Sequence, residues 1–118
     1  NYGDMQRDFT YIDDIVEGVV RVMDVPMPNN NDNPPYQLFN IGNNNPVQLT
    51  EFIDILVDAL GNKNEVKREL KPMQPGDVKC TYADIDKLNS CVGYKPSTPL
   101  RDGLREFAKW FKEYRHSS

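Results

Sequence analysis

Apolar residues recur every three or four positions in three stretches of the chain, the spacing that places them on one face of an α-helix. This pattern predicts helices over residues 14–24, 49–60 and 99–114. Gly61 follows the second stretch at the position where a C-terminal cap is expected. Gly18 interrupts the first stretch at a cost of about 1 kcal/mol relative to alanine, which predicts that a neighbouring segment approaches closely there.

Acidic residues mark the starts of two predicted helices. Asp14 is followed three residues later by Glu17, the arrangement of a capping box, so Asp14 is expected to cap the first helix. Asp84 is expected to cap a fourth, shorter helix that runs to about Cys91 and ends at Gly93. The last helix is predicted to turn an apolar stripe inwards, formed by Leu100, Leu104, Phe107, Phe111 and Tyr114.

Short extended segments are predicted between the helices. Residues 7–12 alternate polar with apolar side chains, and residues 37–41 and 65–70 have the composition of strands. Proline, glycine and asparagine make residues 25–35 and 72–77 loops. Strands that alternate with helices predict the α/β class, here a small α+β-like lobe of two or three short strands packed with about four helices.

Length and charge narrow the function classes. The 118 residues suit a single domain, and the net charge of −4 argues against nucleic acid as a partner. No apolar run approaches the roughly 20 residues that a membrane-spanning helix needs, and no secretory leader opens the chain. The chain starts at Asn1 without a methionine, so further sequence is expected upstream.

The soft metal ligands are few. Cys80 and Cys91 form no CxxC pair, and His116 is the single histidine, which is too small a set for a zinc site. We interpret the cysteines as reduced thiols, which predicts a cytoplasmic protein.

The motifs of a complete enzyme are missing from the chain. The seven glycines are spaced too widely for a GxGxxG dinucleotide loop or a Walker loop. The adjacent acids Asp13 and Asp14 stand at a helix start, where acids usually stabilise the helix dipole rather than act as an acid/base pair. No catalytic residue and no cofactor-binding residue are therefore predicted within these 118 residues.

Two positions are suited to a ligand. Arg7 precedes a helix N-terminus, and its guanidinium could bind a phosphate through two parallel hydrogen bonds; alternatively it pairs with Asp8 or Asp13. Asp77 follows Pro75-Gly76 on a stiff turn and could accept hydrogen bonds from two vicinal hydroxyls; alternatively it only stabilises that turn. The residues alone leave both alternatives open.

Four segments in order resemble the extended short-chain dehydrogenase/reductases that act on nucleotide sugars. They are residues 3–15 (GDMQRDFTYIDDI), 39–43 (FNIGN), 73–84 (MQPGDVKCTYAD) and 93–104 (GYKPSTPLRDGL). The first two are general to that superfamily, whereas the third is narrower and resembles UDP-glucuronate 4-epimerases. The resemblance covers nearly the whole chain.

The resemblance implies a C-terminal substrate-binding lobe over residues 1–118 and an upstream Rossmann domain that binds NAD and carries a Tyr-x-x-x-Lys pair. None of the six tyrosines in this chain has a lysine four residues later. Such enzymes oxidise the sugar at C4 to a ketone, turn the sugar and return the hydride to its other face. The implied parent enzyme is a homodimer, and this chain alone is expected to be a monomer without NAD or activity.

The resemblance also implies roles for four residues. Arg7 would neutralise the diphosphate of a UDP-sugar, and Asp77 would hold the ribose hydroxyls. Gln74 stands where some relatives have an arginine on the diphosphate, and it can donate a hydrogen bond but no charge. Tyr2 is expected near the uracil. A dehydratase, decarboxylase or reductase lobe, and a detached binding module without catalysis, remain the alternative hypotheses.

Overall fold

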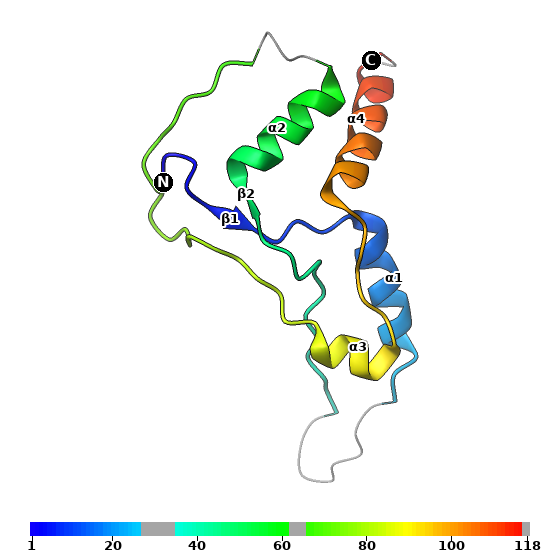
Figure 1. The fold of residues 1–118 in the computed structure, drawn as a ribbon. Coiled ribbons are helices and arrows are strands. Elements are labelled where there is room, and N and C mark those ends of the chain that lie inside the picture. Colours follow the sequence, from blue (N-terminus) through cyan, green and yellow to red (C-terminus); the bar gives the residue numbers. More distant parts are fainter. Residues whose placement is uncertain (27–34, 62–65, 117–118) are drawn as a thin grey trace.

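The chain forms four helices and a two-stranded sheet over the residues that the computed structural model describes, 1–26, 35–61 and 66–116. In chain order the elements are β1 (Gln6–Arg7), α1 (Ile12–Met23), β2 (Val47–Gln48), α2 (Leu49–Leu60), α3 (Asp86–Val92) and α4 (Leu100–His116) (Figure 1). The predicted class, a small α/β lobe with about four helices, is confirmed.

The sheet is shorter than the sequence predicts. Strands β1 and β2 pair antiparallel, with Gln6 opposite Gln48 and Arg7 opposite Val47. On the other edge of β1, Gln6 makes one isolated parallel bridge to Cys80. Of the predicted extended segment 7–12, only Arg7 lies in a strand; Tyr11 keeps an extended backbone, and Ile12 begins helix α1.

Two predicted strands are wrong. Residues 37–41 are irregular, the Leu38 side chain is 75% exposed, and the Leu38 carbonyl accepts a hydrogen bond from Lys87 Nζ at 2.7 Å instead of a strand N–H. Residues 66–70 are irregular and exposed, and Glu65 lies outside the described residues. Strand-like composition needs a neighbouring backbone to pair with, and neither segment has one in the described part of the chain. Residues 27–34 of the predicted loop 25–35 also lie outside it.

The core is small and lies mainly where α2 packs against α4 and where α1 packs against α3. Its buried apolar residues are Met5, Ile55, Ile85, Leu88, Leu104 and Ala108. The predicted inward stripe of α4 is partly wrong, because Phe107 is 45% exposed and Tyr114 is 61% exposed. Helix α2 is covered instead by the face that carries Leu104 and Ala108.

The prediction at Gly18 is confirmed by its surroundings. A side chain there would place Cβ 3.1 Å from Ile41 Cδ1 and 3.5 Å from Tyr94 Cε1. A side chain at residue 18 would crowd these neighbours, so the glycine favours the close approach of the helix.

Asp14 does not cap α1, contrary to the sequence prediction. The N-cap residue is Tyr11, which makes no side-chain capping bond, and Asp14 lies in the first turn. The Asp14 carboxylate instead accepts hydrogen bonds from the Thr98 N–H at 3.0 Å and the Thr98 hydroxyl at 2.9 Å. The Tyr94 hydroxyl donates to the Asp14 carbonyl at 2.9 Å. Asp14 therefore ties α1 to the segment that leads into α4.

The other predicted helix ends agree with the observed ends to within a residue or two. Gly61 caps α2 with a φ of 79°, and Gly93 caps α3 with a φ of 62°. The N-cap of α3 is Ile85 rather than Asp84, but the Asp84 carboxylate still accepts from the first helical N–H, that of Asp86, at 3.0 Å.

The molecule is elongated. Its extents are 61 × 36 × 24 Å and its radius of gyration is 18.1 Å, whereas a compact chain of this length has a radius of gyration of about 13 to 14 Å. Helix α1 correspondingly leaves Val16, Val19, Val20 and Met23 about half exposed or more. None of the described helices is long and apolar enough to span a bilayer.

Candidate functional site

Strand β1 fixes the backbone beneath Arg7. The Gln6 N–H donates to the Lys79 carbonyl at 2.9 Å, and the Thr81 N–H donates to the Gln6 carbonyl at 3.2 Å. The Arg7 side chain is 24% exposed. Its Nη1 donates to the Gln6 carbonyl at 2.7 Å, so the main chain orients the guanidinium.

Asp77 ends a tight turn in the exposed segment of residues 66–80. The Asp77 N–H donates to the Gln74 carbonyl at 3.2 Å, and Gly76 has a φ of 84°. Proline at the second position and a positive-φ glycine at the third are typical of a type II turn. Asp77 Oδ1 accepts from the Val78 N–H at 2.9 Å, so the carboxylate also has a local role in this turn.

The structure brings Arg7 and Asp77 into direct contact. Arg7 Nη2 lies 2.5 Å from Asp77 Oδ1, and the aspartate side chain is 38% exposed. The alternative partners Asp8 and Asp13 are not used by Arg7 among the described contacts. Since both groups reach solvent, an ion pair of this kind is worth about 0.2–1 kcal/mol. Its interest lies in the juxtaposition of a cation and an anion on one surface.

Gln74 and Tyr2 lie along the same two segments but not in the ion pair. Gln74 is exposed in the turn that carries Asp77. Tyr2 is 63% exposed with a φ of 52°, and its N–H donates to the Lys71 carbonyl at 2.8 Å. Residues 1–7 and 71–81 therefore run side by side, as Figure 1 shows, and all four candidate residues lie on this pair of segments.

Asp8 is a supporting residue that the sequence analysis considered only as a partner for Arg7. Its carboxylate accepts hydrogen bonds from the main-chain N–H groups of Asn44 at 3.0 Å, Asn45 at 3.4 Å and Ala83 at 3.0 Å. The sequence feature that could have identified this role is the position of Asp8 directly after a strand. Asp8 joins three segments next to the Arg7–Asp77 pair.

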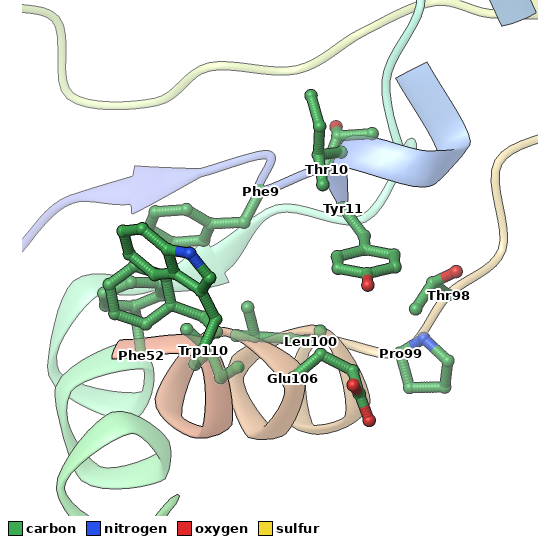
Figure 2. Close-up of a pocket in the computed structure, with 13 residues that line it drawn as sticks. Phe9, Thr10, Tyr11, Phe52, Thr98, Pro99, Leu100, Glu106 and Trp110 are labelled. Atoms are coloured by element: carbon green, nitrogen blue, oxygen red, sulfur yellow. The ribbon is translucent and has the colours of Figure 1, made fainter. Parts of the chain in front are cut away.

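A cavity of about 530 Å³ opens elsewhere, between residues 9–12 and helix α4. Figure 2 shows Phe9, Phe52 and Trp110 gathered at one end, with Tyr11 nearer the other. The Phe9 and Phe52 rings stack at 4.2 Å between centroids. Burial, followed by the negative charges of Asp13 and Glu106, raises the pKa of Tyr11.

This cavity does not suit a dinucleotide. Its lining is mainly aromatic and aliphatic, and Glu106 is the only formally charged residue in it, with the wrong sign for a phosphate. The described residues also contain no group of three or more histidines, cysteines or acids that could hold a metal ion. The candidate ligand site therefore remains the surface of Arg7 and Asp77.

Comparisons with known proteins identify the family of the chain. The family described as GDP-mannose 4,6 dehydratase matches residues 1–107. Protein CapI of Staphylococcus aureus is 41% identical over 97% of this chain and 37% of its own length. UDP-glucuronate 4-epimerase 3 of Arabidopsis thaliana is 37% identical over 97% of this chain and 28% of its own.

A solved structure also resembles this chain. The UDP-glucuronic acid 4-epimerase of Bacillus cereus, in complex with UDP-glucuronic acid and NAD, matches with a TM-score of 0.76 and 32% identity. The match covers 95% of this chain and 33% of that protein. The chain thus spans about a third of the length of the relatives that it matches.

Proposed function

Because the chain belongs to the GDP-mannose 4,6 dehydratase family, as the C-terminal region of an extended short-chain dehydrogenase/reductase acting on nucleotide sugars, we propose that it is the UDP-sugar-binding lobe of a UDP-glucuronate 4-epimerase. The contact between Arg7 and Asp77 carries the proposal. It joins, on one surface, a guanidinium for a diphosphate and a carboxylate for ribose hydroxyls. The relatives named for UDP-glucuronate support the choice of sugar.

Each candidate residue has a part in this proposal. Arg7 neutralises the diphosphate, and Gln74 donates a hydrogen bond to it without adding charge. Asp77 accepts hydrogen bonds from the ribose hydroxyls, and Tyr2 lies against the uracil. This set binds a part of the substrate that does not react, and such contacts offset the cost of ordering the sugar at the reactive centre.

A firm hold on UDP suits an epimerase. The hexose has to turn over between removal and return of the hydrogen at C4, so the enzyme needs to hold the nucleotide more tightly than the sugar. In the proposal this chain supplies the hold on the nucleotide. NAD and the residues that move the proton belong to the part of the parent protein outside this chain, and the parent is a cytoplasmic homodimer.

A dehydratase is the second candidate, because the matching family carries that description. Incubation of the complete protein with UDP-glucuronate and NAD, followed by ¹H NMR of the sugar, separates the candidates. An epimerase gives UDP-galacturonate with the C6 carboxylate retained, and a decarboxylase releases CO₂. A dehydratase leaves UDP-glucuronate unchanged and instead consumes a nucleotide sugar with a hydroxyl on C6, which is supplied in a parallel sample. Turnover of none of these substrates would favour the non-catalytic binding module.

A further inference from the structure

The apolar cavity between residues 9–12 and α4 continues onto the outer face of helix α1. Ile12 lines the cavity and is also the first residue of α1. Further apolar side chains follow it on the same face at the spacing of a single helical stripe, and each is about half exposed or more: Val16, Val19, Val20 and Met23. A helix of 12 residues extends about 18 Å, so the cavity and this α1 stripe together are longer than one small molecule can cover.

Aromatic rings extend the same surface along α4. Trp110 lines the cavity and is still 54% exposed. Its indole stacks on the Tyr114 ring at 5.4 Å between centroids and lies 5.8 Å from the Phe107 ring. A contiguous exposed apolar surface is typical of a contact with another folded segment, and aromatic residues supply much of the binding energy in such contacts.

One acidic group interrupts this apolar surface. Glu106 lines the cavity, and Figure 2 shows it on the side of Tyr11 rather than beside the stacked rings. None of the ion pairs between described residues involves Glu106. Besides burial, which has the largest effect, the charges of Asp13, Glu106 and Asp14 raise the pKa of Tyr11, so the electrostatic field at this end of the cavity is negative.

This charge restricts what can cover the cavity. A segment that covers it removes water from the Glu106 carboxylate, and a carboxylate that loses its water without gaining a partner is costly. A covering segment therefore has to bring a cation to Glu106. The neighbouring aromatic rings also favour a cation, because a positive charge is attracted to the face of a ring.

The rest of the parent protein is the polypeptide best placed to supply that segment. This chain spans 33% of the length of the Bacillus cereus UDP-glucuronic acid 4-epimerase and 37% of the length of Protein CapI. A segment of the same polypeptide reaches the surface at an effective concentration of about 1 mM or more, which a separate molecule rarely attains.

We propose that the cavity and the α1 stripe are the docking surface for a segment of the parent protein outside this chain, and that this segment places a lysine or arginine side chain against Glu106. The inference goes beyond the proposed function, and its test involves neither UDP nor turnover of a sugar.

Hydroxyl-radical footprinting of the complete protein tests this contact, because mass spectrometry reports the oxidation of Trp110 separately from that of other side chains. The oxidation rate of Trp110 is compared in the wild type, Glu106→Lys, Glu106→Gln and Glu106→Asp. Asp102→Lys is the matched control, since it reverses a charge on the same helix at an exposed residue that does not line the cavity.

Glu106→Lys is expected to raise the oxidation rate of Trp110 about two- to fivefold, because two cations then face each other and the segment detaches more often. Glu106→Gln, which keeps the shape and is measurable even if the lysine variant does not fold, should give a smaller rise. Glu106→Asp keeps the charge and should stay near the wild type. Asp102→Lys should leave the oxidation of Trp110 unchanged.

Equal oxidation of Trp110 in the wild type, Glu106→Lys and Glu106→Gln overturns the inference, as does an equal rise in Asp102→Lys. Other occupants give different results. Wild-type oxidation that rises on about tenfold dilution of the protein indicates a second copy on this surface. Wild-type oxidation that rises after exhaustive dialysis indicates a small organic cation. Either result also overturns the inference.

Discussion

The carboxylate of Asp8 accepts a hydrogen bond of 3.0 Å from the main-chain N–H of Ala83, 75 residues further along the chain. The same carboxylate accepts from the N–H groups of Asn44 and Asn45. One side chain thus satisfies the backbone of two other segments and holds them beside the strand that carries Arg7.

Replacement of Asp8 by alanine is expected to lower the free energy of unfolding of the complete protein by about 2–3 kcal/mol, because three backbone donors lose a charged acceptor. Urea unfolding followed by circular dichroism measures the change. Asp4→Ala is the matched control, since it loses only an exposed ion pair worth about 0.2–1 kcal/mol. Equal losses in the two variants would contradict the role given to Asp8.

Gly42 is expected to tolerate no side chain. An alanine there would place its Cβ 2.4 Å from the Cβ of Ala83, and we expect a loss of about 1–3 kcal/mol of unfolding free energy from this overlap. Ala83→Gly removes the opposing atom, so the double variant should recover part of that loss. A double variant no more stable than the sum of the two single losses would rule out the contact as the cause.

Arg7→Ala is expected to lower kcat/KM for UDP-glucuronate in the complete enzyme by a factor that corresponds to about 1.5–3 kcal/mol, the range for a hydrogen bond to a charged group. Arg7→Lys should fall between, because lysine keeps the charge but loses the two-pronged geometry. Arg105→Ala, on an exposed arginine that pairs with Asp102 on α4, is the control. An unchanged kcat/KM in Arg7→Ala would remove Arg7 from the site.

Tyr94 is expected to contribute to the alkaline limit of stability. Burial, followed by the charge and hydrogen bond of Asp14, raises the pKa of Tyr94 above 10.0, although Arg21 opposes the shift. Its stabilising contribution is therefore fully present below about pH 10 and is lost as the pH rises through the folded-state pKa.

Tyr94→Phe is expected to lower stability near neutral pH by about 0.5–1.5 kcal/mol, through loss of the hydrogen bond to the Asp14 carbonyl. It should also flatten the decline of unfolding free energy above pH 10 relative to the wild type. Urea titrations at several pH values between 8 and 11 measure both effects (about one titration per half unit suffices). Parallel pH profiles for the two proteins would contradict the assignment.

These 118 residues on their own are expected to retain no NAD, to leave UDP-glucuronate unchanged and to bind UDP with a Kd of about 1 mM, because they supply only part of a pocket. Cofactor absorbance after purification, NMR of the sugar and a UDP titration test the three statements in turn. Epimerisation by the purified chain would show that the catalytic groups lie within it.

The helices were predictable from sequence because each depends mainly on local spacing. Leu49–Leu60 with its glycine cap has the predicted bounds. The strand predicted at residues 37–41 failed because pairing depends on a partner segment, and composition does not identify one. The prediction that Asp14 caps the first helix was wrong for a similar reason. Its carboxylate accepts hydrogen bonds from Thr98, a residue distant in sequence that the local pattern does not identify.

The candidate site was predictable in part. A guanidinium and a carboxylate suited to one ligand were evident from residue types and from the resemblance, and the structure places them in contact. Their direct pairing was not anticipated, because the sequence suggested Asp8 or Asp13 as the partner. The Asp8 carboxylate accepts hydrogen bonds from backbone N–H groups instead. Arg7 pairs with Asp77 on the neighbouring segment.

The elongated outline has a practical consequence for anyone who handles this chain. A particle with a radius of gyration of 18.1 Å diffuses more slowly than a sphere of 13.6 kDa and elutes early from a gel-filtration column. A globular calibration curve would then report a mass above the true 13.6 kDa. Sedimentation equilibrium or light scattering, which measure mass without assuming a shape, are the methods that can count its subunits.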